Sequence, residues 1–289
     1  MLIDLIQVPF DSGHRGARMG AGPGHLLAHG AVERLREAGA TVRETGVGLE
    51  PGFAAEVAAA FDLARATAFA VRTARGRGSL PIILAGNCIS AVGTMAALPH
   101  PGTGVVWLDA HADLNTPETT TSGMVDGMAL STVLGRCWTG MTGKIDGFAA
   151  VPEENVLLAG ARDLDDAERY YLERSRILAA GPEALRGRRG MGDRLDALAG
   201  RVDGVYLHVD LDVHDAGEGR ANAFAGAGGL TAEEVRALVR EVAGRVPIVA
   251  AAITAYDPAA DEDGRMLPIA LDLLQTIAET ASGRGGDRS

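Results

Sequence analysis

The feature that most constrains the fold is a regular alternation of short apolar runs with longer helical patterns. The apolar, strand-like runs cover residues 2–8, 41–44, 81–85, 104–108, 155–159, 204–210 and 247–253. Helical patterns lie between them, at residues 25–38, 53–75, 89–97, 127–134, 165–174, 191–198, 231–242 and 267–280. Such alternation is typical of a parallel sheet covered by helices on both faces. The sequence therefore predicts one three-layer α/β domain over residues 1–281, followed by a disordered, Gly-rich tail at 282–289.

Charge balance and the lack of a long apolar stretch exclude several classes of protein. With 27 Lys and Arg against 38 Asp and Glu, the 289-residue chain has a formal net charge of −11. A basic nucleic-acid footprint is therefore not expected, and no apolar stretch reaches the roughly 18 residues that a membrane span needs. Two cysteines are too few for a disulfide framework. These features predict a cytoplasmic protein that binds neither nucleic acid nor membrane.

A first cluster of metal-ligating residue types follows the apolar run 104–108. Asp109, His111 and Asp113 alternate in the segment DAHAD, so in an extended chain all three side chains face one way. Two carboxylates and an imidazole that converge at a strand end suit a divalent ion such as manganese, iron or zinc. The alternative is a solvated polar loop whose histidine caps a helix.

A second cluster ends the apolar run 204–210. Asp210 and Asp212 share one face, and His208 lies on that face one step deeper in the sheet. Alone, this pattern could be a solvated strand end. Together with the first cluster it concentrates four carboxylates, a charge that cations relieve. Two metal ions bridged by shared carboxylates would lower the pKa of a bridging water enough to give hydroxide near neutrality.

The segment DAHADLNTPETTTSG at residues 109–123 and the DLD at 210–212 resemble the ureohydrolase family, which comprises the arginases and agmatinases. The likeness begins at PFDSG, residues 9–13, and runs along nearly the whole chain. It implies a single α/β domain and hydrolysis of a guanidino group by the bridging hydroxide of two Mn²⁺ ions. It also implies that Asp109 and Asp210 bridge the two ions, that Asp113 binds the first, and that His111 and Asp212 bind the second.

The resemblance breaks at three positions. The family has a histidine ligand in a Gly-Gly-Asp-His-Ser turn, and here that turn reads GNCIS, which places Cys88 at the ligand position. We expect Cys88 to bind the first metal as a thiolate, the alternative being a lost ligand with a buried thiol. Asp126 stands where arginases have a mobile, proton-carrying histidine, and Ala255 aligns with the glutamate that grips the guanidinium. Asp126 is therefore the predicted catalytic residue, either as a proton relay or as a partner of a substrate hydroxyl.

The family's contacts to the amino-acid end of the substrate are retained. Asn115 and Ser122 match the residues that hold the α-carboxylate, and Asp165 and Glu168 match those that hold the α-amino group. The alternatives are acids at a helix N-terminus or in a solvated loop. The combination predicts a small guanidino amino acid as partner, with a modified guanidine.

Nω-hydroxy-L-arginine fits this prediction, because an N-hydroxyl lowers the basicity of the guanidine and reduces the need for a carboxylate clamp. The pattern also resembles the family branch that converts this compound to hydroxyurea and L-ornithine in D-cycloserine biosynthesis. Two alternatives stay open: an arginase that acts on L-arginine, and a degenerate family member that binds ligand without turnover.

Overall fold

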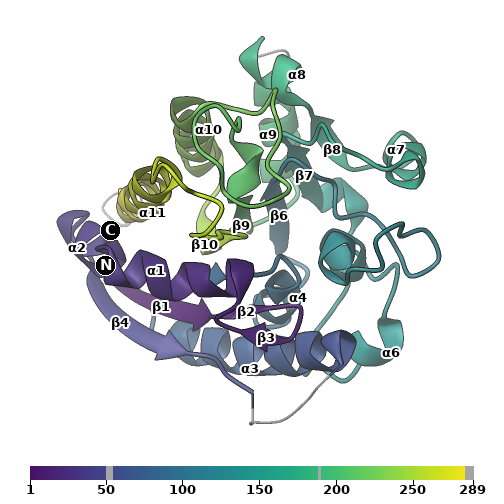
Figure 1. Ribbon diagram of the computed structural model, residues 1–289. Helices are drawn as coiled ribbons and strands as arrows, with labels where there is room; N and C mark the ends of the chain where they lie inside the picture. Colours follow the sequence, from purple (N-terminus) through teal and green to yellow (C-terminus); the bar gives the residue numbers. More distant parts are fainter. Residues whose placement is uncertain (50–54, 188–189, 284–289) are drawn as a thin grey trace.

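A computed structural model describes residues 1–49, 55–187 and 190–283. Its centre is an eight-stranded sheet in the order β4-β1-β5-β10-β9-β6-β7-β8 (Figure 1). All neighbouring strands of this sheet are parallel. The strands are β1 Leu2–Val8, β4 Thr41–Gly46, β5 Leu80–Ala85, β6 Thr103–Leu108, β7 Val156–Ala159, β8 Leu178–Ala180, β9 Gly204–Asp210 and β10 Ile248–Thr254. A separate two-stranded hairpin consists of β2 Phe10–Asp11 and β3 His14–Arg15.

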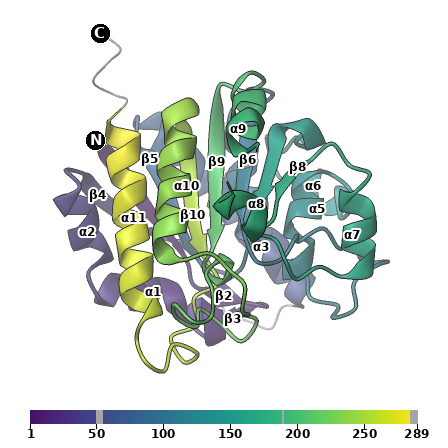
Figure 2. The ribbon, with the colours of Figure 1, turned by 90° about the horizontal axis from the view of Figure 1, so that it is seen from above.

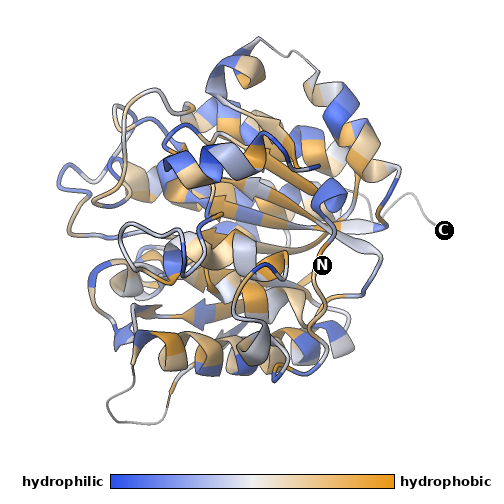
Figure 3. Ribbon diagram, turned by 90° about the vertical axis from the view of Figure 1, so that its right-hand side faces the viewer, coloured by the Kyte–Doolittle hydropathy of each residue, from blue (hydrophilic) through white to orange (hydrophobic). Residues whose placement is uncertain are grey.

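Helices cover both faces of the sheet and enclose two hydrophobic cores. One face carries α1 Gly22–Ala28, α2 Ala31–Glu37, α9 Met191–Ala199, α10 Ala232–Arg245 and α11 Met266–Ser282. The other carries α3 Glu56–Gly76, α4 Ser90–Met95 and α5 Ala129–Val133. Figure 2 shows α10 and α11 side by side, and Figure 3 shows hydrophobic strands between helices of mixed character. Apolar strands buried on both sides are expected where helices cover a parallel sheet.

The other helices of the described residues are short and pack against the two cores through Ala184, Met141 and Tyr171 among others. They are α6 Thr139–Thr142, α7 Asp166–Leu172 and α8 Pro182–Arg186, with 3-10 turns at Arg18–Ala21, Asp126–Met128, Glu153–Asn155 and Leu211–Val213. No helix within residues 1–49, 55–187 and 190–283 combines the length and the apolar character needed to traverse a bilayer.

The predicted three-layer α/β architecture is confirmed, and several boundaries are corrected. Residues 2–8 and 204–210 form strands over the predicted bounds, whereas β8 and the hairpin were missed. The helix expected at 25–38 is two helices, because Gly30 between them has a φ of 103°. Helix α11 extends through Ser282, one residue into the predicted tail, and residues 284–289 lie outside the described residues.

The polar clusters lie at one edge of the sheet, at the carboxyl ends of four central strands. Cys88 follows β5, Asp109 follows β6, Asp210 ends β9, and Ala255 follows β10. These strands are neighbours in the order β5-β10-β9-β6. The carboxyl ends of parallel strands lie at the same edge, which is where α/β sheets place their ligands.

The turn after β5 depends on a glycine that has no room for a side chain. A Cβ at Gly86 would lie 2.2 Å from the carbonyl oxygen of Phe10 and 2.8 Å from the backbone of Gly20. We therefore expect Gly86→Ala to lower the free energy of unfolding in urea by about 2–4 kcal/mol, the range of severe backbone and packing defects. Gly24→Ala is the control, because a Cβ at Gly24 in α1 meets nothing within 4 Å and alanine favours helix. Equal stability of the two variants would contradict this prediction.

Candidate metal centre and substrate pocket

A pocket at the carboxyl edge of the sheet collects the acidic and polar side chains that the sequence singled out. Its volume is about 280 Å³, and we call it the carboxylate pocket. The predicted site residues that line it are Cys88, His111, Asp113, Asn115, Ser122, Asp126, Asp165, Glu168, Asp210 and Asp212. Asp109 lies beneath it and is only 1% exposed. The structure brings every predicted site residue to one place, while their roles stay predictions.

One part of this centre is an imidazole held between two carboxylates. Nδ1 of His111 lies 3.4 Å from Oδ1 of Asp109 and 3.4 Å from Oδ2 of Asp212. Burial would lower the pKa of His111, but the two carboxylates outweigh it and raise the pKa to about 12. Burial would raise the pKa of Asp212, but the hydrogen bond and the charge of His111 outweigh it, and the pKa falls to about 2. The positive charge of protonated His111 thus lies between two carboxylates, a position that also suits a metal cation.

The other part of the centre contains the cysteine. Sγ of Cys88 lies 3.1 Å from Oδ2 of Asp210, which accepts a hydrogen bond from the thiol. Burial, followed by the charge of Asp210, raises the pKa of Cys88 well above its usual value. Among the described residues, the buried Oδ2 of Asp113 has no hydrogen-bond partner. A buried, unpaired carboxylate oxygen beside a thiol is costly without a cation.

The donor set fits two divalent cations. In the described part of the chain, two groups of ligand atoms lie close enough to hold an ion. One is Cys88 with Asp109 and His208, and the other is Asp109 with His111 and Asp212. Asp109 belongs to both groups, as a bridging carboxylate must. Burial is the main reason that the pKa of Asp109 rises to about 6, and it also raises the pKa of Asp210. Cations would relieve this concentration of buried acid.

Backbone and indole donors fix the orientation of the shared carboxylate. Nε1 of Trp107 donates to Oδ2 of Asp109 over 3.0 Å, and the backbone N–H of His111 donates to its Oδ1 over 2.7 Å. The segment is not extended as predicted. Asp113 has a φ of 51°, so a left-handed turn, rather than strand alternation, brings its carboxylate to the pocket.

Comparisons with known proteins agree on one family. The model described as the arginase family matches residues 2–279. The chain belongs to the arginase family. The arginase of Bacillus caldovelox is 29% identical over 95% of this chain and 97% of that protein, and human arginase-1 is 28% identical over 83% and 80%. The crystal structure of arginase from Bacillus cereus matches with a TM-score of 0.87 at 28% identity, covering 96% of this chain and 98% of that chain.

In this arginase-family pocket, three of the four residues predicted for the amino-acid end are joined by hydrogen bonds: Asn115, Asp165 and Glu168. Nδ2 of Asn115 donates to Oδ2 of Asp165 over 2.8 Å, and Ser122 is exposed at the rim. Glu168 accepts the backbone N–H of Leu114 over 2.8 Å and that of Asp165 over 3.0 Å. Glu168 therefore also caps helix α7, the structural role that the sequence had left open.

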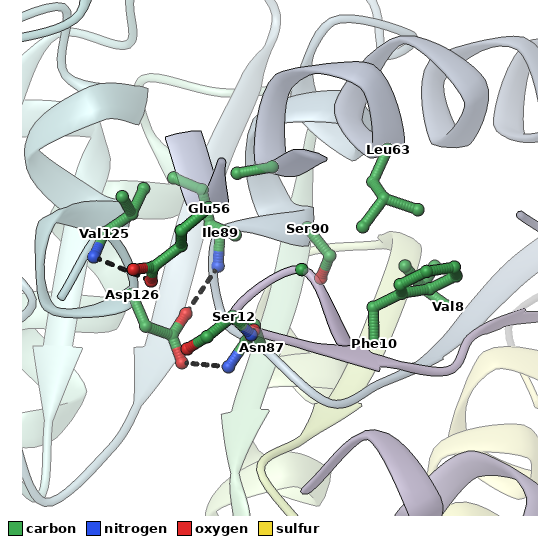
Figure 4. A pocket seen from close by; sticks show the side chains of 12 residues that line it. Val8, Phe10, Ser12, Glu56, Leu63, Asn87, Ile89, Ser90, Val125 and Asp126 are labelled. Atoms are coloured by element: carbon green, nitrogen blue, oxygen red, sulfur yellow. Dashed lines mark hydrogen bonds between the residues drawn. The ribbon is translucent and has the colours of Figure 1, made fainter. Parts of the chain in front are cut away.

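Asp126, which lines the carboxylate pocket, is held by two hydrogen-bond donors, seen in Figure 4 from a second cavity that Asp126 also lines. Its carboxylate accepts the backbone N–H of Ile89 over 3.0 Å and Nδ2 of Asn87 over 2.8 Å. Burial outweighs these hydrogen bonds and raises the pKa of Asp126 to about 7. The carboxyl group can thus carry or release a proton at neutral pH. Ala255 also lines the pocket and contributes no charge there.

Sequence reasoning missed an arginine that holds the turn after β9. The guanidinium of Arg162 donates to the backbone carbonyls of Asp212 and Gly226 over 3.0 Å each, and to that of His214 over 3.2 Å. Nδ2 of Asn222 reaches Oδ2 of Asp212 over 3.4 Å. The sequence shows Arg162 only as a basic residue at the start of the acidic segment ARDLDD. The backbone carbonyls that it binds in the turn after β9 lie far along the chain, so no local pattern points to them.

His208 lies beneath the pocket, one step deeper than Asp210, as the strand pattern predicted. Its ring stacks on Trp107 with centroids 3.6 Å apart, and Nδ1 lies 2.8 Å from the hydroxyl of Tyr206. Burial lowers its pKa to about 3, so the ring is neutral. The hydroxyl of Thr254 lies 3.3 Å from both Nε2 of His208 and Sγ of Cys88, which connects this histidine to the metal centre.

Proposed function

We propose that this arginase-family protein hydrolyses the guanidino group of Nω-hydroxy-L-arginine to hydroxyurea and L-ornithine, with two Mn²⁺ ions bound in the carboxylate pocket. The observation that carries the proposal is an asymmetry of the pocket. Polar groups at the amino-acid end, Asn115, Asp165 and Glu168, are present, whereas the uncharged Ala255 stands where the family grips a guanidinium. A neutral hydroxyguanidine has less need of a carboxylate there, because no full positive charge requires a partner.

The proposed ligands follow the family resemblance and agree in part with the two groups of ligand atoms, which share Asp109 and place Cys88 in one and His111 and Asp212 in the other. Asp109 and Asp210 would hold both ions, Cys88 and Asp113 the first, and His111 and Asp212 the second. When bound, the ions would polarise the guanidino group and lower the pKa of a water molecule towards neutrality.

The other side chains would position the substrate and move protons. Asn115 and Ser122 would donate to the α-carboxylate, while Asp165 and Glu168 would accept from the α-ammonium group. Asp126, protonated or ionised near neutral pH, would receive the N-hydroxyl or carry a proton. The leaving nitrogen of ornithine needs that proton before the C–N bond breaks.

An arginase that acts on L-arginine is the second candidate. It is favoured by the relatives, since the proteins from Bacillus caldovelox and human that match this chain are themselves named arginases. The acidic lining of the carboxylate pocket would also accept a guanidinium cation. The two candidates differ in what Asp126 and Ala255 do, and substrate competition separates them.

We expect the manganese-loaded protein to release ornithine from Nω-hydroxy-L-arginine at a kcat/KM at least about 100-fold above that for L-arginine, the scale at which a site discriminates a matched polar group. Agmatine, which lacks the α-carboxylate, should give still less product, measured as putrescine. Preference for L-arginine would establish the arginase instead. No product from any of the three, with metal bound, would indicate a binding protein.

A further inference from the structure

Asp126 lines a second cavity besides the carboxylate pocket, and we infer that a proton path runs from Asp126 through one water molecule in that cavity to Glu56 and on to the surface. The inference rests on the proposed function, since hydrolysis requires protons to leave and re-enter the pocket. The family's mobile histidine is replaced here by Asp126, whose carboxylate is held in place by two hydrogen bonds.

The second cavity, which we call the rear cavity, has room for one water molecule. Its volume of about 20 Å³ exceeds the roughly 10–15 Å³ that one water needs. Figure 4 shows Asp126, Ser90 and Glu56 around it, with Phe10 and Leu63 among its apolar walls. Asp126 lines both this cavity and the carboxylate pocket. One side chain therefore contacts the two compartments that a proton must cross.

A buried hydroxyl supplies independent evidence for a water in the rear cavity. Ser90 lines the cavity and is 5% exposed, and its Oγ has no hydrogen-bond partner among the described residues. Buried hydroxyls are normally paired, with ordered water where protein offers no partner. Asp126 and Glu56 line the same cavity, and we take them as the other polar partners of a water bound to Ser90, within the two to four that buried waters have.

Glu56 connects the rear cavity to solvent. It lines both the rear cavity and an open outer cleft, whose other charged or titratable residues are Asp11, His14, Arg18 and Asp257. Its Oε1 accepts the backbone N–H of Val125 over 3.2 Å, so it is tied to the residue next to Asp126. A carboxylate so placed can take a proton from the water and release it to solvent.

The two groups that donate hydrogen bonds to Asp126 cannot serve as an exit. The carboxamide of Asn87 and the backbone N–H of Ile89 both donate to Asp126, and neither group takes up a proton at neutral pH. They hold the carboxylate without conducting protons. Asp126 lines two spaces through which a proton can pass, the carboxylate pocket and the rear cavity. The rear cavity is the route away from the substrate.

The proton transfers balance without a further reactant. The attacking water gives a proton to the carboxylate of Asp126, which passes it to the cavity water as that water gives one of its own to Glu56. Glu56 then releases a proton to solvent. The reverse sequence delivers the proton that the leaving ornithine nitrogen takes up, and only O–H and N–H bonds change along the path.

Glu56→Gln tests the path. Asp62→Asn on the same helix is the control, because the half-exposed side chain of Asp62 pairs with Arg65 and neither residue lines the cavity. We expect Glu56→Gln to lower kcat about 10- to 100-fold, at or below the usual range for loss of a proton-transfer group, with KM unchanged. Small buffers such as imidazole should restore the rate of Glu56→Gln and leave the parent and the control unaffected. An undiminished kcat, or a loss that no buffer restores, would overturn the path.

A crystal structure gives a readout that needs no turnover. We expect an ordered water between Ser90 Oγ, Asp126 and Glu56, and its absence would overturn the path whatever the activity. Turnover without that water would remove the path and leave the proposed function intact. A water in place with no turnover of Nω-hydroxy-L-arginine, L-arginine or agmatine would overturn both.

Discussion

Asp109→Asn is expected to remove both metal ions and to abolish hydrolysis. Asp109 is the carboxylate common to the two groups of ligand atoms, and its side chain is buried beneath the pocket. Loss of an outer partner of a metal ligand costs roughly 10- to 100-fold in metal affinity or activity. Loss of a ligand shared by both ions should have a larger effect than loss of an outer partner, so we expect kcat to fall by at least about 1,000-fold.

An amide at position 109 also conflicts with the surrounding donors. Trp107 Nε1 and the backbone N–H of His111 donate to different oxygens of Asp109, and an amide offers only one oxygen. Metal content per chain, measured by elemental analysis after dialysis, checks the prediction alongside kcat. Asp193→Asn in helix α9 is the control, since Asp193 is exposed. Two tightly bound ions in Asp109→Asn would show that Asp109 does not bridge them.

The fold was predictable where the sequence pattern is local. Runs 2–8 and 204–210 became strands β1 and β9 because their apolar residues are buried on both faces. Strand β8, Leu178–Ala180, was missed because three residues give too short a period to recognise. The split between α1 and α2 was missed because the helical period continues across Gly30, whose left-handed backbone breaks the helix.

The sequence predicted the site residues whose positions follow from the ends of strands. Asp109 and Asp210 come together because β6 and β9 are adjacent and parallel. Arg162 and Ser90 could not be identified in this way. The carbonyls of Asp212 and Gly226, which Arg162 binds, lie 50 and 64 residues further along the chain. The unpaired hydroxyl of Ser90 becomes notable only once its surroundings are known.

Removal of the metal ions is expected to destabilise the protein, and more so as the pH rises from about 4 to about 6. In the metal-free protein burial raises the pKa of Asp109 from 3.8 to about 6, so between these values the folded state binds more protons than the unfolded state. The free energy of unfolding therefore falls with rising pH in this window, by about 3 kcal/mol for a shift of this size. The raised pKa values of Asp113 and Asp210 act in the same direction.

Metal binding has the opposite pH dependence, because the ligands must lose their protons to bind. Saturating ions stabilise the folded state by about 4 kcal/mol per site at 1,000 times the dissociation constant, so the gap between loaded and chelated protein should widen towards pH 6. Urea unfolding of both forms across this range measures it. Asp113→Asn should weaken the pH-dependent loss in the chelated protein, because it neutralises a carboxylate whose Oδ2 has no partner within the described residues. Chelated protein that instead gains stability between pH 4 and 6 would show that these carboxylates are not forced together without metal.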